Sequence, residues 1–187
     1  MKKLLLATLL LSLLACTENN STDTYAVQKA QISEDYDPEA KLKELGIELR
    51  QPGAPVANYV NAVQTGNLLF LAGKGPNKPE GGYVTGKVGI DLSVEEGYEA
   101  AKLTAISQLS VLKAELGNLN RVKRIVNVLG MVNCGPDFGN QPEVINGFSD
   151  LMVEVFGERG KHARAAVGMN SLPRNTSVEI EMIVEIE

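Results

Sequence analysis

The stretch that decides the fold is residues 162–187, HARAAVGMNSLPRNTSVEIEMIVEIE. It predicts a strand over 162–169, a turn at 171–175, where Pro and Asn punctuate the chain, and a second strand from residue 178. Beyond the turn, apolar residues alternate with mostly acidic ones, which is typical of a strand with one buried face and one acidic face. The residues expected in the core are Val178, Ile180, Met182, Val184 and Ile186.

A β-hairpin is predicted further upstream, after a short helix over 38–46. Its arms are residues 59–64 and 68–72, and Gly66 supplies the positive φ that the turn between them requires. The second arm, LLFLA, is apolar on both faces, so we expect a central strand that is covered on both sides.

Two long helices are predicted between this hairpin and the closing strands. The first begins with a capping box formed by Ser93 and Glu96 and ends at Gly117, and the second spans 143–156. A strand over 121–132 separates them. The resulting order, β-β-α-β-α-β-β, predicts an α+β two-layer domain in which both long helices cover one face of a mostly antiparallel or mixed sheet.

The N-terminus has the pattern of an export signal. Lys2 and Lys3 precede an apolar stretch at 4–14, which is too short to span a bilayer, and Leu13-Leu14-Ala15-Cys16 resembles the bacterial lipobox. We therefore expect a signal peptide over 1–15, a lipidated Cys16 with a polar tether over 16–36, and one domain over 37–187. The alternative is an ordinary secretory signal whose Cys is incidental. Lipidation would place the protein on the cell envelope, with the outer membrane favoured.

Composition argues against nucleic acid as a partner. The chain has 187 residues and a formal charge of −5, and without Lys2 and Lys3 only 16 basic residues face 23 acidic ones. An acidic body without a basic stripe is poorly suited to bind phosphate backbones.

The standard catalytic motifs are missing from the sequence. It contains no glycine-rich dinucleotide or phosphate-binding loop and no nucleophile elbow, and a single His and the one Cys that remains beside Cys16 argue against a metal site. Cys134 fits a small buried hydrophobe better than a reactive thiol. His162 fits a surface or strand-edge imidazole better than a catalytic base.

Arg164 and Glu179 form the most unusual pair in the sequence. Arg164 stands between alanines near the start of its strand, and Glu179 begins the next strand. If these strands pair as a hairpin, the two side chains become neighbours. Two interpretations remain open at this point, a structural surface ion pair and a ligand site.

Several spaced segments together resemble one protein family. The stretch 162–183, the ANYVNAV segment at 57–63, the turn at 65–67, Gly73 to Pro76, and Asn146-Gly147-Phe148 fall in the order found in the RidA/YjgF family of reactive intermediate deaminases. The resemblance covers about residues 45–187. It implies a chorismate-mutase-like fold, a homotrimer, and ligand sites in clefts between subunits.

The resemblance also assigns roles to individual residues. Arg164 matches the arginine that binds the substrate carboxylate, and Glu179 matches the glutamate that positions the attacking water. Tyr59, backbone groups near Gly73, and Asn146 match residues that line the cleft. The frequent family cysteine two residues after the arginine is Ala166 here, which weakens the idea of a reactive thiol.

The implied reaction is hydrolysis of a 2-imino acid or enamine to a 2-oxo acid and ammonia, with no cofactor and no metal. The alternative is a protein that captures a small carboxylate in the same trimeric cleft without turnover. A ribonuclease is the third and least favoured hypothesis, because the acidic surface disfavours RNA.

Overall fold

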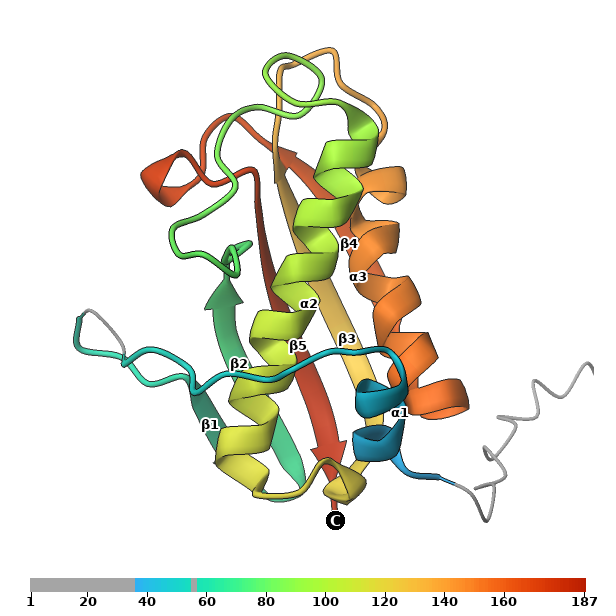
Figure 1. Ribbon diagram of the computed structural model, residues 1–187. Coiled ribbons are helices and arrows are strands. Elements are labelled where there is room, and N and C mark those ends of the chain that lie inside the picture. Colours follow the sequence, from blue (N-terminus) through green and yellow to red (C-terminus); the bar gives the residue numbers. More distant parts are fainter. Residues whose placement is uncertain (1–35, 55–56) are drawn as a thin grey trace, which may run out of the picture.

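The structure is a computed structural model that describes residues 36–54 and 57–187. Two long helices lie side by side on one face of a five-stranded sheet, with strand order β1-β2-β5-β3-β4 (Figure 1). The strands are β1 (Ala62–Thr65), β2 (Leu68–Lys74), β3 (Val122–Asn133), β4 (Ala163–Met169) and β5 (Val178–Ile186). The helices are α1 (Pro38–Glu44), α2 (Val94–Leu116) and α3 (Gln141–Phe156), with short 3₁₀ turns η1 (Leu119–Arg121), η2 (Gly157–Gly160) and η3 (Pro173–Asn175). The predicted α+β class and the order of the elements are confirmed.

The sheet is mixed, and this changes how the closing strands relate. β4 runs parallel to β3, while β3 and β2 both pair antiparallel with β5. β3 therefore lies between β4 and β5, which do not form a hairpin. Arg164 and Glu179 are not cross-strand neighbours, and the condition for a direct ion pair between them is not met.

Local signals in the sequence explain where the elements begin and end. The Ser93 hydroxyl accepts from the Glu96 backbone amide at 3.1 Å, and the Glu96 carboxylate accepts from the Ser93 amide at 2.7 Å, so the capping box opens α2. Gly117 ends α2 with φ of 72°. Gly66, with φ of 57°, makes the tight turn between β1 and β2.

The core lies between the helices and one face of the sheet. All five predicted core residues of β5 are buried, as are the inward-facing residues of α3, among them Phe148 and Met152. A Cβ on Gly147 would collide with the carbonyl oxygen of Tyr98, so this glycine lets α3 approach α2 closely. Gly147 therefore has a packing role.

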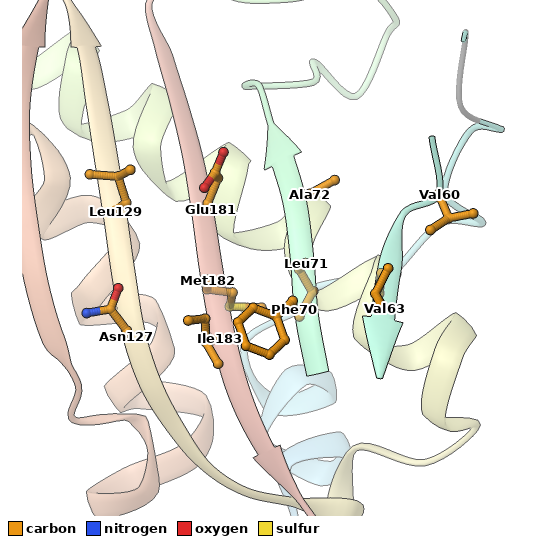
Figure 2. Close-up of a pocket in the computed structure, with 11 residues that line it drawn as sticks. Val60, Val63, Phe70, Leu71, Ala72, Asn127, Leu129, Glu181, Met182 and Ile183 are labelled. Atoms are coloured by element: carbon orange, nitrogen blue, oxygen red, sulfur yellow. The ribbon is translucent and has the colours of Figure 1, made fainter. Parts of the chain in front are cut away.

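The opposite face of the sheet is only partly covered by the described residues. Phe70 of β2 is 41% exposed and Val63 of β1 is 56% exposed. Phe70 pairs with Ile183 of β5, and both lie in an open hollow of about 380 Å³ (Figure 2). The prediction that β2 is covered on both sides is thus wrong for the single chain. Only Leu69 and Leu71, on its other face, are buried.

The predicted signal peptide and Cys16 lie outside the described residues. From residue 36 onward, leaving out 55–56, no helix combines the length and apolarity needed to cross a bilayer. Tyr36, assigned to the tether, contacts the domain: its hydroxyl donates to the Val122 carbonyl at 3.0 Å, and the Arg159 guanidinium lies 3.8 Å from its ring centre. Burial raises the pKa of the Tyr36 hydroxyl to about 12.

Candidate functional site

Arg164 is held by α3 at the edge of the sheet. It pairs in register with buried Val128, so its side chain lies on the helix-covered face. Nη1 donates to the Asn146 Oδ1 at 2.9 Å and to the Ser149 Oγ at 3.0 Å. These two bonds use both Nη1 hydrogens, while Nε and Nη2 have no partner among the residues that the structure describes. Three donors of the guanidinium remain available to a ligand, and two of them, one on Nε and one on Nη2, point along the same edge.

A second layer of contacts lies behind Ser149. His162 Nε2 is 3.0 Å from the Ser149 Oγ, and His162 Nδ1 is 2.6 Å from the Gly160 carbonyl oxygen. The ring also packs edge-on against Phe148, with centroids 6.5 Å apart. Burial, together with the nearby Arg164 charge, lowers the pKa of His162 below its usual 6.5 and outweighs the Gly160 contact, which favours the cation. The imidazole is therefore a neutral group that is hydrogen-bonded to Ser149 and Gly160.

Glu179 lies on the other face of the sheet. Its register partner is Met131 of β3, and its carboxylate lies over Gly73 of β2, where a Cβ would collide with the Glu179 Oε1. Gly73 is therefore required for this position of Glu179. Burial, and then the charge of Glu181, raise the pKa of the Glu179 carboxyl above its usual 4.5, although Lys74 opposes the shift.

Lys74 is the cation near Glu179. Its Nζ donates to the Asn61 Oδ1 at 2.7 Å, and burial lowers its pKa although the charge of Glu179 acts in the opposite direction. The Lys74 Nζ and the Glu179 carboxylate oxygens lie more than 4.0 Å apart, so the two side chains form no direct ion pair. Glu179 is thus a half-buried carboxylate with a nearby positive charge but no hydrogen-bond donor among the described residues, an environment that favours taking up a proton.

The predicted site residues fall into separate groups in one chain. Arg164 and Asn146 contact each other, and Glu179 and Gly73 contact each other, but these two pairs lie on opposite faces of the sheet. Tyr59 is 48% exposed and precedes β1, at the sheet edge opposite β4. A site that uses all five residues must therefore combine more than one copy of the chain.

Ser149 and Lys74 were missed from the sequence, although spacing could have indicated Ser149. Asn146 and Ser149 are three residues apart on one helix face, and His162 and Arg164 are two apart on one side of the chain, so a helix packed on that strand brings all four together. Cys134 is buried, as predicted, beside the Gln141 amide at 3.8 Å. Within 36–54 and 57–187, no group of three or more His, Cys, Asp or Glu side chains could hold a metal ion.

Comparisons with known proteins agree with the fold. The family model described as "YjgF/chorismate_mutase-like, putative endoribonuclease" matches residues 39–186. Protein TCP17 of Trypanosoma cruzi is 45% identical over 148 residues, covering 79% of this chain and 92% of that protein. A 2-iminobutanoate/2-iminopropanoate deaminase of Dermatophagoides farinae is 31% identical, covering 71% of this chain and 89% of the deaminase.

A solved structure extends the likeness to three dimensions. A protein of unknown function from Agrobacterium tumefaciens superposes with a TM-score of 0.74 at 46% identity, over 80% of this chain and 94% of its own. Because the family model spans most of the chain and the relatives are covered nearly end to end, this chain belongs to the YjgF family, with its chorismate-mutase-like fold.

Proposed function

We propose that this protein binds a small carboxylate through Arg164 and hydrolyses 2-imino acids to 2-oxo acids and ammonia. The observation that carries the proposal is the state of Arg164. Its Nη1 is fixed by Asn146 and Ser149, while its Nε–Nη2 edge is unpaired among the described residues. That edge matches the two oxygens of a carboxylate, and a bidentate pair of this kind is strong and directional.

The catalytic cleft lies between copies of the chain. Arg164 and Glu179 lie on opposite faces of one sheet, so Glu179 reaches a substrate on Arg164 only from a second copy. The open face, which exposes the apolar Phe70 and Val63 beside the acidic residues of β5, supplies a surface for that association. We propose the homotrimer that the family resemblance implies, in which each cleft takes Arg164 and Asn146 from one protomer and Glu179 and Gly73 from its partner.

The chemistry needs little beyond positioning and proton transfer. Arg164 holds the substrate carboxylate, and Glu179 takes a proton from water as the water oxygen adds to the imine carbon. Glu179 returns that proton to nitrogen, which gives a carbinolamine. Glu179 then takes the proton of the new hydroxyl group and passes it to the amine as the C–N bond breaks, so that the 2-oxo acid and ammonia leave. The raised pKa of Glu179 suits a group that must accept and return a proton near neutral pH. The name of the mite relative supports this reaction class.

A capture protein without turnover is the second candidate, since the Arg164 contacts alone account for binding. We further propose, from the lipobox-like sequence ending at Cys16, that the domain is tethered to the bacterial cell envelope by a lipid. Both candidates operate in that location, the second as a carboxylate-binding protein of the envelope.

The test uses soluble protein that lacks residues 1–16. Ammonia release is measured from 2-imino acids generated in the assay, and binding of 2-oxobutanoate is measured by calorimetry. Arg164→Gln should abolish both binding and turnover, whereas Arg174→Gln, which removes an exposed guanidinium from η3, should change neither. Glu179→Gln should abolish turnover and keep binding, with Glu80→Gln as its matched control.

The outcomes separate the candidates. Binding that needs Arg164, with no ammonia release by the wild type, would leave only the capture protein. RNA cleavage that survives Arg164→Gln would overturn both carboxylate hypotheses in favour of a ribonuclease.

A further inference from the structure

The contacts of Ser149 and His162 fix the direction of every hydrogen bond behind Arg164. The Gly160 carbonyl oxygen can only accept, so His162 Nδ1 carries the hydrogen in that 2.6 Å contact. A neutral imidazole then has its lone pair on Nε2, and the lowered pKa of His162 favours this neutral form. The Ser149 hydroxyl must therefore donate to Nε2 across 3.0 Å.

This direction determines what Arg164 meets. With its hydrogen committed to His162, the Ser149 oxygen presents lone pairs to Arg164 Nη1 at 3.0 Å. The Asn146 Oδ1 accepts the other Nη1 hydrogen at 2.9 Å. Both hydrogens of one nitrogen are thus anchored to α3, which fixes the guanidinium plane and turns the Nε–Nη2 edge away from the helix.

We propose that Ser149 and His162 are positioning residues that orient the carboxylate-binding edge of Arg164 before a ligand arrives. This inference rests on the proposed function, in which that edge binds the substrate carboxylate. Neither residue needs to touch the substrate. His162 orients the Ser149 hydroxyl, and the Ser149 oxygen orients Arg164. The three residues therefore form one hydrogen-bond relay and not independent contacts.

A hydrogen-bond relay predicts that the losses caused by substituting its members are not additive. Removing Ser149 disconnects His162 from Arg164, so a second substitution at His162 should then cost nothing further. In Ser149→Ala and in His162→Ala we expect the Kd for 2-oxobutanoate and the KM for the imino acid to rise about tenfold, the loss of one charge-assisted hydrogen bond. Because the chemistry is performed elsewhere, kcat should change much less. The double variant should match the singles.

Two further variants sharpen the test. In His162→Gln, the side-chain carbonyl oxygen can accept from Ser149 in place of Nε2, so most of the affinity should return. Ser171→Ala, at an exposed serine in the turn before β5, serves as the matched control. The order of Arg164 itself is measured by ¹⁵N NMR of its Nε–Hε group, assigned by its loss in Arg164→Lys. Its heteronuclear NOE should fall in Ser149→Ala and His162→Ala and recover in His162→Gln.

The NMR measurement separates two kinds of failure. An Arg164 NOE that is unchanged in Ser149→Ala, or losses of affinity that add in the double variant, would overturn the hydrogen-bond relay. If the NOE falls in the variants but the wild-type protein binds no carboxylate, the result would support the hydrogen-bond relay and overturn the proposed function instead.

Discussion

The two halves of the proposed site differ in how completely one chain builds them. On the helix-covered face, Arg164 has its hydrogen bonds to Asn146 and Ser149 in place. On the open face, Glu179 is half-buried over Gly73, and its pKa is raised because no donor offsets the lost hydration. The first half is ready to receive an anion, whereas burial disfavours the carboxylate form of Glu179 in the second half and raises its pKa. Binding and proton transfer are therefore assigned to different faces of the same sheet.

The largest effect should come from separating the copies. Phe70→Glu places a charge among the exposed apolar residues of the open face, and burying it unpaired in an interface would weaken self-association at least about 100-fold. Sedimentation should show monomers, ammonia release should be lost, and Arg164 should retain its NMR order because its contacts are within one chain. Ile90→Glu, at an exposed apolar residue in a loop, should leave the assembly intact. Full turnover by a monomer would contradict the shared cleft.

The next effect should fall on the Glu179 half alone. A Cβ in Gly73→Ala would displace the Glu179 side chain, and a misplaced catalytic group can lower turnover about 100-fold. The Kd for 2-oxobutanoate should stay within about twofold, since the Arg164 that binds the carboxylate in each cleft belongs to another copy and keeps its own contacts to Asn146 and Ser149. Gly139→Ala is the control, because nothing lies within 4 Å of its added Cβ. Equal losses of binding and turnover would show that the two halves are not separable.

Much of the helix-covered face was predictable, since local patterns encode it. The Ser93 capping box, the alternation in β5 and the inward residues of α3 all appear where the sequence indicates. Strand order was not predictable in the same way, because no sequence pattern near Arg164 or Glu179 indicates that β3 lies between their strands. The exposure of Phe70 could not be foreseen either, since an apolar strand has the same sequence whether its cover comes from its own chain or from another.

A smaller effect should appear in the pH profile of turnover. The acid limb reports the carboxylate form of Glu179, so it should lie above the usual carboxyl pKa of 4.5. The Lys74 charge favours the carboxylate, so Lys74→Gln should move this limb to higher pH. Lys78→Gln, at a lysine on the following loop, should leave it in place. A limb that moves to lower pH in Lys74→Gln would contradict the assignment of Glu179 as the proton acceptor.

The smallest effect concerns stability, measured in the monomeric Phe70→Glu background. Because the pKa of Glu179 is higher in the folded than in the unfolded chain, the folded state binds more protons between the two values. The free energy of unfolding must therefore fall as the pH rises through that window. Glu179→Gln should remove this dependence and be more stable than its parent at neutral pH, by less than about 1 kcal/mol because the group is partly solvated. The difference should vanish below pH 4.5 in urea titrations. A lower free energy of unfolding for Glu179→Gln at neutral pH would mean that the fold stabilises the carboxylate. The two halves of the site would then not differ as described.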